Sequence, residues 1–377
     1  MGGVCGRNPY GVGNSGREER GVAAGGGGGV IVRGGKVCPM IEDGNCPVCE
    51  AHEWEEAGRK VYTRAAMEDG DNYLRLRGRV LFEVWFPGRS EVELRAVVCR
   101  RCGFVQYFPR PEAKDLDEKY NFLGREDTEE EPEGGLPERI NSRRAADLYG
   151  RVARHLPRGR ARILDFGGET GRLMRPFVRA GHECFMLDYS APTEDGVVHL
   201  ERDFGELEPG AEFDAVVCSH VLEHLADPAG VVRRLYGVLR AGGLLYAEVP
   251  LEIRGGVPLG REPVTHVNYF AAPAFRHVLE RGGFSVRECR QGVFVYGNAR
   301  PRRMVYAVAE KGAAKAGAPP GDAYRHVRGL LRPSPAARAA DAARHLAYLA
   351  RHPGLYGPAA VLLLEKLRTG RQRLPRR

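Results

Sequence analysis

Four of the nine cysteines form two pairs with metal-ligand spacing, Cys46 with Cys49 in "NCPVCE" and Cys99 with Cys102 in "VVCRRCGF". Two thiolates separated by two residues can bind one ion from a tight turn, and two such pairs complete the tetrahedron that zinc prefers. The gap between the pairs exceeds the usual zinc-ribbon spacing, so we expect a β-hairpin insertion to bring them together. The spacing predicts a structural zinc site with no open position, whose role is to fold its module.

The alternative interpretation is four reduced cysteines without a metal. A redox role is disfavoured, because neither pair opens a helix in a βαβ unit, where the helix dipole would lower a thiol pKa. Cys184 and Cys218 fall within apolar runs. We expect both to be buried as small apolar side chains.

A second candidate site is the glycine loop in "ILDFGGETGRL", residues 163–173. An apolar run that ends in an acid and then in glycines is how a strand delivers a nucleotide-like ligand to a helix start. Asp165 ends the run, and Gly167, Gly168 and Gly171 follow it. Glu169 stands where familiar glycine fingerprints place another glycine, and a sharp turn without a ligand would also use glycine.

Polar residues also follow the next apolar runs. Asp188 ends "CFMLD", a position from which a carboxylate can accept hydrogen bonds from both hydroxyls of a ribose. Ser219 and His220 follow "FDAVVC", where loops that face a ligand should lie. His220 and His266 are the candidate catalytic bases, with structural or capping roles as the alternative. For the residues of "EH" at 223–224 we expect a role in fixing a helix start.

The elements that must position these residues change type along the chain. The sequence predicts five segments: a disordered glycine-rich tail at 1–38, a β-rich zinc module at 39–111, an acidic linker at 112–137, an α/β domain at 138–311 and a basic helical extension at 312–377. Within the module, "YLRLRGRVLFEVWFPG" and "EVELRAVVC" are expected to form strands.

The α/β domain alternates short apolar strands with helical stretches. We expect strands at "ARILDF", "ECFMLD", "GVVHL", "FDAVVCS" and "GLLYAEV", and helices at "PAGVVRRLYGVLR" and "PAFRHVLERGG". This alternation predicts a mainly parallel sheet with helices on both faces. "FSVRECRQG" and "RMVYAVAE" should pair as antiparallel edge strands.

The amino-acid composition limits the kinds of partner that the protein is expected to bind. The 377 residues carry a net charge of +8, with 43% hydrophobic and 28% charged residues, as in soluble globular proteins. No apolar run reaches the roughly 20 residues that cross a membrane, and the first residues lack a secretory signal pattern. We expect a cytoplasmic protein without a membrane partner. The late arginines fit a solvated helix face better than nucleic-acid binding, because no aromatic residues alternate with them.

Taken in order, five segments resemble the class I methyltransferases that use S-adenosylmethionine. These segments are "ILDFGGETGRL", "CFMLDYS", "FDAVVCSHVLEHLADP", "LRAGGLLYAEVP" and "HVNYFAAPAFRHVLERGGF", and they lie between about 140 and 310. The stretch "CRRCGFVQYFPRP" is similar to the zinc-binding domain that precedes some of these enzymes. The resemblance implies a Rossmann-like sheet with helices on both faces, preceded by a small β-rich zinc module and followed by a helical tail.

The resemblance also implies roles for particular residues. In the family, an acid like Asp165 and glycines like Gly167, Gly168 and Gly171 shape the methionine pocket, while an acid like Asp188 holds the ribose. An acid at Asp203 would lie near the adenine amine. The loop of Ser219 and His220 would border the methyl donor and the acceptor.

Glu169 departs from the family's usual D-x-G-x-G-x-G pattern. A glutamate at a helix N-terminus would repel the pyrophosphate of a dinucleotide, whereas S-adenosylmethionine carries cationic groups and no phosphate. Glu169 therefore argues against a nicotinamide cofactor, although its side chain could crowd the methionine moiety.

The sequence thus predicts methyl transfer from S-adenosylmethionine to a small-molecule or sugar-like acceptor of a biosynthetic pathway. The alternative is an inactive methyltransferase fold that binds a partner through its zinc module and basic tail. Methylation of nucleic-acid bases is not expected, because the proline-aromatic motif of base-directed enzymes is absent where the chain has "CSHVLEH".

Overall fold

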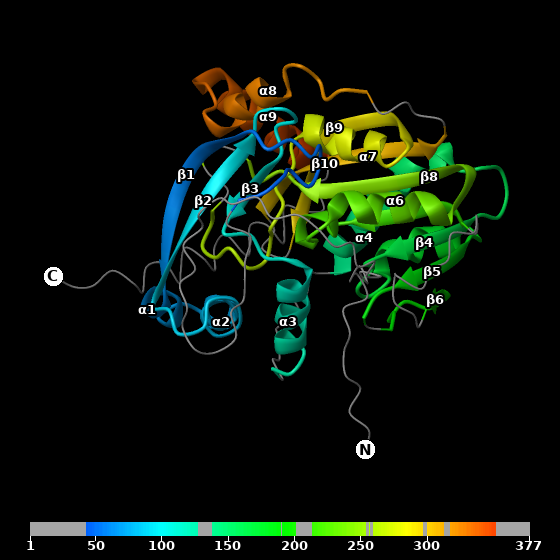
Figure 1. The fold of residues 1–377 in the computed structure, drawn as a ribbon. Coiled ribbons are helices and arrows are strands. Elements are labelled where there is room, and N and C mark those ends of the chain that lie inside the picture. The colour runs from blue at the N-terminus through cyan, green and yellow to red at the C-terminus, as the bar shows by residue number, and fades with distance from the viewer. Residues whose placement is uncertain are drawn as a thin grey trace, which may run out of the picture.

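The described part of the chain forms two sheets flanked by helices (Figure 1). The computed structural model describes residues 43–126, 138–189, 191–200, 213–253, 256, 259–296, 300–312 and 317–351. A three-stranded antiparallel sheet is built from the N-terminal part, and a seven-stranded sheet from residues 162–311. Asp203 and the predicted tail at 1–38 lie outside the described residues.

The seven-stranded sheet has the order β6-β5-β4-β7-β8-β10-β9. Its strands are β4 (Arg162–Phe166), β5 (Glu183–Leu187), β6 (Val197–His199), β7 (Phe213–Ser219), β8 (Leu239–Pro250), β9 (Phe284–Tyr296) and β10 (Arg300–Lys311). The first five pair in parallel, and β10 is antiparallel to both β8 and β9. The predicted α/β fold with a mainly parallel sheet is confirmed. One detail was wrong: β9 is an edge strand, but β10 lies inside the sheet.

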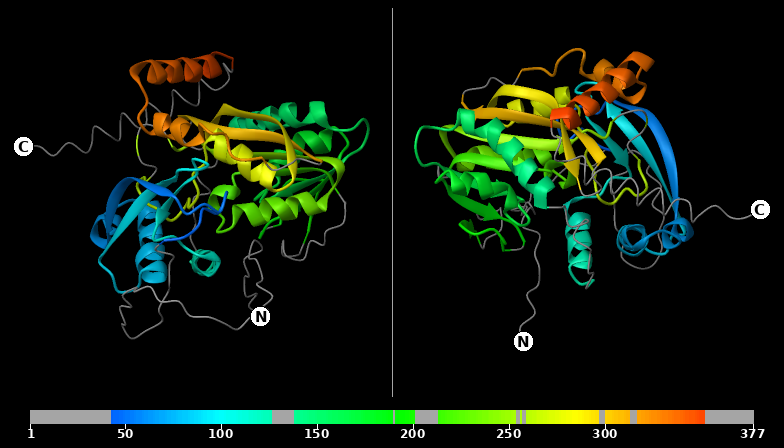
Figure 2. Two further views of the ribbon diagram at one scale, coloured as in Figure 1. Left: turned by 45° about the horizontal axis from the view of Figure 1, so that its top comes forward. Right: turned by 180° about the vertical axis from the view of Figure 1, so that it is seen from behind.

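Helices cover both faces of this sheet (Figures 1 and 2). They are α4 (Glu138–Val152), α5 (Arg175–Arg179), α6 (Pro228–Val238) and α7 (Ala272–Arg281). Because neighbouring residues of a strand point to opposite faces, β4 contributes Leu164 to a core with α6 and α7 and Ile163 to a core with α4 and α5. The side chains of both cores are almost fully buried. This packing on both faces fixes the carboxyl ends of the strands.

The N-terminal sheet has the order β1-β2-β3, with β1 (Trp54–Thr63), β2 (Glu91–Cys99) and β3 (Val105–Phe108). The strand expected at 91–99 is present, but the strand expected at 73–88 is not. That segment forms α2 (Asn72–Arg79) and a π-helix at Val80–Trp85, preceded by the short α1 (Arg64–Glu68). The insertion between β1 and β2 is therefore helical.

The helical outcome at 72–85 has a local cause. Asp71 caps α2 by accepting the backbone N–H of Leu74 at 3.0 Å. Leu76, Val80 and Trp85 are buried at spacings of about one helical turn. The run of apolar residues at 80–82 suggested a strand, but the cap and the helical spacing decide the structure.

The N-terminal sheet and the large sheet share one hydrophobic core. Buried residues from Val48 to Leu116 belong to the same cluster as one face of the seven-stranded sheet. Helix α3 (Ala113–Leu123) occupies the first part of the segment that the sequence assigned to a linker, and Leu116 and Lys119 in it are buried. Loss of structure in the N-terminal part should therefore disturb the rest of the molecule.

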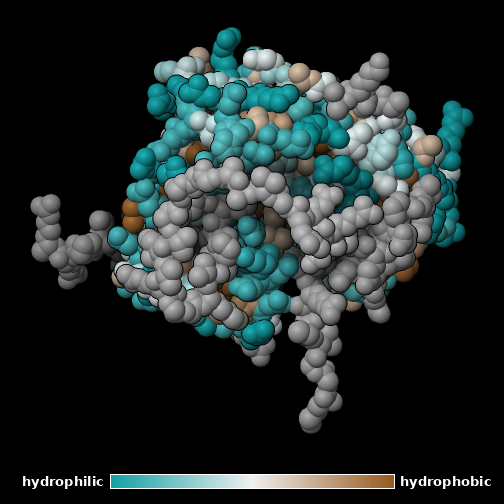
Figure 3. All heavy atoms as spheres, viewed as in Figure 1, coloured by the Kyte–Doolittle hydropathy of each residue, from teal (hydrophilic) through white to brown (hydrophobic). Residues whose placement is uncertain are grey.

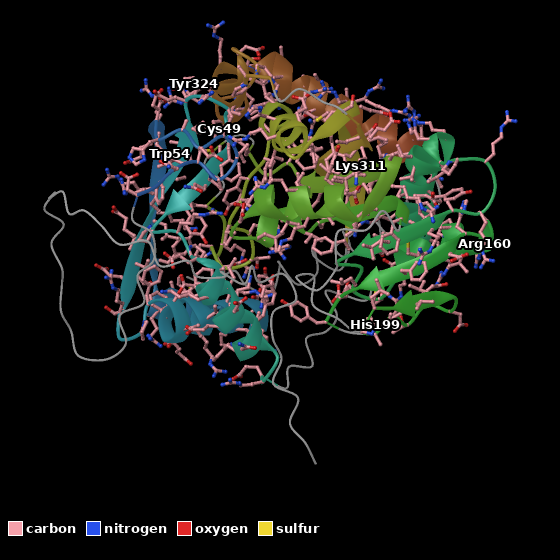
Figure 4. The ribbon with its side chains drawn as sticks, turned by 45° about the vertical axis from the view of Figure 1, so that its right-hand side comes forward. Cys49, Trp54, Arg160, His199, Lys311 and Tyr324 are labelled. Atoms are coloured by element: carbon pink, nitrogen blue, oxygen red, sulfur yellow. The ribbon has the colours of Figure 1, made fainter. Side chains whose placement is uncertain are left out.

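The chain continues into α8 (Ala323–Leu331) and α9 (Pro335–Arg351), as the predicted helical tail requires. Tyr324 and Arg328 of α8 hydrogen-bond Glu55 of β1, and Asp341 of α9 pairs with the buried Arg303 of β10. Tyr324 lies in the same corner of the molecule as Cys49 and Trp54 (Figure 4). No described helix is long and apolar enough to cross a bilayer. On the face in Figure 3, hydrophilic residues predominate among the coloured atoms.

Candidate functional site

The four predicted zinc ligands come together in one buried cluster. The Sγ atoms of Cys46 and Cys102 lie 3.6 Å apart, those of Cys49 and Cys99 lie 3.5 Å apart, and all four lie within 4.8 Å of one another. A tetrahedral zinc ion with bonds of about 2.3 Å places its sulfur ligands about 3.8 Å apart. Each of the four side chains is at most 4% exposed. The donor set and its dimensions therefore fit a closed structural zinc site.

The backbone explains how distant pairs meet. Trp54 at the start of β1 pairs with Cys99 at the end of β2. The antiparallel pairing thus carries the second pair of cysteines back to the first. Gly103 follows the second pair with a φ of 73°, a left-handed conformation that closes the turn and suits glycine. Its N–H donates to the carbonyl of Cys99 at 2.9 Å.

The glycine loop lies directly after β4 and is tied to β5. The N–H of Gly167 donates to the carbonyl of Leu187 at 2.9 Å, and the N–H of Glu169 donates to Oδ2 of Asp188 at 2.8 Å. Gly168 is the position where room is critical, because a Cβ there would lie 2.4 Å from Oδ2 of Asp165. The loop thus brings both predicted acids to one edge of the sheet.

Asp165 is the most unusual carboxylate of this edge. It is 1% exposed, and neither of its carboxylate oxygens accepts a hydrogen bond from the described residues. Burial, with the charge of Asp188 acting in the same direction, raises the pKa of Asp165 to about 7. Buried polar atoms are nearly always paired in native proteins. A cationic or donor-rich ligand such as the methionine part of S-adenosylmethionine would supply the missing partner.

Asp188 is half-buried and part of the loop's own structure. Its Oδ1 accepts the N–H of Tyr189 at 2.7 Å, and its carbonyl lies 3.0 Å from Nε2 of His199 at the end of β6 (Figure 4). Glu169 is exposed and has a φ of 53°. The exposure of Glu169 agrees with a side chain directed away from the buried Asp165.

Ser219 takes part in a buried polar network behind the loop. Its hydroxyl donates to Oε1 of Glu248 at 2.7 Å and accepts from Nη2 of Arg144 at 2.8 Å. Burial alone would raise the pKa of Glu248, but the charges of Arg144, His220 and Arg151 outweigh it and lower the pKa to about 2. The hydroxyl of Ser219 is thus already committed to protein partners.

His220 follows β7 in a left-handed conformation with a φ of 57°. Such a conformation is uncommon for a residue with a side chain and is often found at functional sites. Its N–H donates to the carbonyl of Glu248 at 2.9 Å, and its Nδ1 lies 3.2 Å from Oε1 of Glu223. Nε2 of His220 is buried and has no hydrogen-bond partner among the described residues. The carboxylate of Glu223 thus orients this imidazole, and its second nitrogen lies 3.9 Å from Oε1 of Glu248, beyond hydrogen-bond distance.

His266 belongs to a second group with Glu223 and His224. Nδ1 of His266 lies 2.8 Å from Oε2 of Glu252, Nδ1 of His224 lies 2.7 Å from the carbonyl of Thr265, and the two rings are 4.8 Å apart. Burial lowers the pKa of His224 to about 3. Burial also opposes the charge of His266, but Glu252 outweighs it and raises that pKa to about 9.

The role expected for residues 223–224 in fixing a helix start was wrong. Helix α6 is capped by Asp227, which accepts the N–H of Gly230 at 2.7 Å. The sequence did carry a signal for the group, because His220, Glu223 and His224 are spaced i, i+3 and i+4, which in a helical turn puts them on one side.

Residues from the N-terminal part hold this group in place, and sequence reasoning missed them. Arg110 donates to the carbonyls of Val267 and Ala226 at 2.9 and 3.0 Å, and to Oδ1 of Asn268 at 2.8 Å. Asn268 in turn donates to the carbonyls of Leu222 and Leu225, both at 2.7 Å. The loop of His266 is therefore fixed from both sides.

Helix α3 also reaches the site. Nζ of Lys119 donates to the carbonyl of Val264 at 3.2 Å, and burial lowers the pKa of Lys119 to about 7. The ring of Tyr120 lies 5.6 Å from that of Tyr189, the residue after Asp188. The N-terminal part thus contributes side chains between the ribose-binding candidate and the histidines.

The sheet order and the helices on both faces are those of a Rossmann-like domain, with the glycine loop and the two acids at the ends of β4 and β5. Residues 138–288 match the family model of a methyltransferase domain. This part of the chain is thus a methyltransferase domain.

Individual relatives cover only part of the chain. It is 33% identical over 135 residues to the ubiquinone biosynthesis O-methyltransferase of Methylocella silvestris, covering 29% of this chain and 52% of the relative. The enzyme of that name from Xanthomonas campestris is 31% identical over 100 residues, or 23% and 41% of the two chains. The chain therefore spans about half the length of the curated relatives it matches. A solved 1,6-didemethyltoxoflavin-N1-methyltransferase from Burkholderia thailandensis aligns over 50% of this chain and 82% of its own, with 20% identity and a TM-score of 0.37.

Proposed function

We propose that the protein transfers a methyl group from S-adenosylmethionine to an oxygen atom of a small-molecule acceptor. The observation that carries this proposal is Asp165, a buried carboxylate whose two oxygens accept no hydrogen bond from the described residues. It lies next to Gly168, in the loop whose Glu169 N–H donates to Asp188. The oxygen acceptor is supported by the names of the two relatives. The roles of the individual residues are part of the proposal.

The cofactor, when bound, supplies a methyl group on a positively charged sulfur. Asp165 would balance the cationic methionine part, and Asp188 would accept hydrogen bonds from the ribose hydroxyls. The side chain of Glu169 is exposed, and in this proposal it points away from the methionine part. Most of the acceleration of an in-line methyl transfer can come from aligning the acceptor and excluding water.

His220 is the preferred base of the two predicted candidates. Glu223 holds Nδ1, so Nε2 can accept the proton of an acceptor hydroxyl. In His266 the nitrogen Nδ1 is held by Glu252, and its ring faces His224, so this residue belongs to a different group. His220 also follows β7 directly, at the same end of the parallel sheet as Asp165 and Asp188.

Turnover with a panel of phenols, catechols and sugar hydroxyls tests the proposal through the release of S-adenosylhomocysteine. We expect His220→Gln to lower kcat by about 10²–10⁴-fold on a substrate that the wild type methylates, with little change in cofactor affinity. His155→Gln, at a histidine near the end of α4, is the matched control. Cofactor binding without turnover of any oxygen acceptor would contradict the acceptor class. A folded, zinc-loaded protein that binds no cofactor would instead support the inactive binding module.

A further inference from the structure

Glu223, His224 and His266 offer one ligand atom each, and these atoms lie within 4.8 Å of one another. Two segments place these residues: Glu223 and His224 follow β7, whereas His266 lies in the loop before α7. The group is separate from the cysteine cluster. Nothing in the proposed methyl transfer explains why two histidines face each other beside a buried carboxylate.

The hydrogen bonds around the group leave the right atoms available. Nδ1 of His224 is held by the carbonyl of Thr265, and Nδ1 of His266 by the carboxylate of Glu252. Nε2 is therefore the ring nitrogen left for an ion in each histidine, and Nε2 of His224 lies 3.8 Å from Oε1 of Glu223. Metal-binding histidines usually have their second nitrogen fixed in this way by a carbonyl or a carboxylate.

Glu223 provides the independent second observation. It is 1% exposed, and its Oε2 has no hydrogen-bond partner among the described residues, while Oε1 lies near Nδ1 of His220. A buried carboxylate oxygen without a partner is costly. A cation bound by this carboxylate and the two imidazoles would satisfy that oxygen.

From this geometry we infer that Glu223, His224 and His266 bind one divalent transition-metal ion. Two imidazoles and one carboxylate suit manganese, iron, cobalt or zinc better than magnesium or calcium, which prefer oxygen ligands. Bonds of about 2.0–2.2 Å place the ligand atoms of one ion about 3.0–3.5 Å apart, so atoms at the 4.8 Å limit must approach each other by more than an ångström. Three protein ligands leave coordination positions open.

The open positions give the ion a role in the proposed function, on which this step rests. An oxygen of the acceptor could occupy one of them, next to His220, and a bound cation makes a hydroxyl more acidic. Lys119 and Arg77 are basic residues near the loop of His266. The carboxylates of Glu252 and Glu262 lie near the same loop and oppose their charge.

Manganese binding tests the site without cofactor or acceptor, in full-length protein that metal analysis shows to carry one zinc per chain, so that zinc fills only the cysteine cluster. Mn²⁺ is a suitable probe because it competes poorly for the thiolates of the cysteine cluster. The loss of the free Mn²⁺ signal in electron paramagnetic resonance should show one bound ion per chain, with the zinc content unchanged. A wild-type protein that binds no Mn²⁺ would overturn the inference, and it would leave the cofactor site untouched.

Variants assign the ion to these residues. Glu223→Gln and His266→Gln should each abolish stoichiometric Mn²⁺ binding, Glu252→Gln should weaken it by about 10–100-fold, and His155→Gln should leave it unchanged. Circular dichroism identifies the folded variants, and His266→Gln decides if Glu223→Gln does not fold. Unchanged Mn²⁺ affinity in a folded His266→Gln protein would place the ion elsewhere and overturn the assignment.

Discussion

The cysteine cluster and the carboxyl edge of the large sheet both concentrate reactive side chains, but the chain leaves them in different states. In the cysteine cluster, four sulfurs face one another at the dimensions of a zinc tetrahedron, and no open position remains. At the sheet edge, Asp165 and Glu223 are buried with carboxylate oxygens that the described residues do not pair. The difference indicates that a single ion would complete the first region, whereas the second would be completed by the ligands that we propose.

The largest effect should come from breaking the cysteine cluster. Cys99→Ser should abolish zinc binding and unfold the N-terminal sheet, because structural zinc contributes about 10–16 kcal/mol of apparent binding free energy in small domains. The shared hydrophobic core should carry the damage into the large sheet and lower Tm strongly. Metal analysis and thermal unfolding measure both effects.

Cys289→Ser is the matched control, because this cysteine is half-buried and lies outside the cluster. The same comparison predicts that His266→Gln lowers Tm far less than Cys99→Ser. The proposed difference between the two regions would be contradicted if Cys99→Ser kept one zinc per chain. It would also be contradicted if Cys99→Ser and His266→Gln lowered Tm equally.

The second prediction concerns Asp165 and pH. Its pKa is raised from 3.8 to about 7 in the folded protein, so the folded state holds the proton more tightly. The resulting stability is fully present below pH 3.8 and is lost as the pH rises through 7. Without cofactor, Asp165→Asn should therefore gain about 2–4 kcal/mol relative to the wild type between pH 4.5 and 8. Urea unfolding at several pH values measures this, and a constant difference would show that Asp165 is not protonated in the fold.

Asp188→Ala should have a smaller effect, confined to cofactor binding. The loss of a hydrogen bond to a charged group should weaken S-adenosylmethionine binding by about 1.5–3 kcal/mol, without unfolding the domain. Asp195→Ala, at an exposed acid a few residues later, is the control for a general change of charge. An equal dissociation constant for Asp188→Ala and wild type would remove Asp188 from the site.

The smallest effect is expected at Glu169. A left-handed residue with a side chain carries about 1–2 kcal/mol of strain, so Glu169→Gly should be slightly more stable and bind the cofactor with similar or modestly higher affinity. Calorimetry and thermal unfolding test the two parts. If the wild type bound no cofactor and Glu169→Gly bound it measurably, the glycine loop would be a decayed cofactor site.

How much the sequence could predict depends on how local each signal is. The cysteine pairs, the glycine loop and the acids after β4 and β5 are short patterns, and the α/β fold follows from alternating strands and helices. The strand expected at 73–88 was wrong, because the Asp71 cap and the helical spacing of Leu76, Val80 and Trp85 outweigh a short apolar run. Local patterns therefore predict single elements well, but they do not show which element forms where two patterns compete.

Long-range placement accounts for what was missed. The contacts of Arg110 and Lys119 with the loop of His266 join residues about 150 positions apart. No spacing in the sequence indicates that Glu223 and His224 should face His266. Only the packing of the N-terminal part against the sheet brings these groups together, and the same packing explains why a zinc module can support a site in another part of the chain.

The central claim is that the edge between Asp165 and Asp188 binds S-adenosylmethionine. Isothermal titration of zinc-loaded, metal-analysed protein with S-adenosylhomocysteine tests it most directly, since this ligand lacks the reactive methyl group and needs no acceptor. We predict one binding site per chain, with affinity lowered in Asp188→Ala and kept in Asp195→Ala. A folded, zinc-loaded wild-type protein that binds neither S-adenosylhomocysteine nor S-adenosylmethionine would contradict the claim.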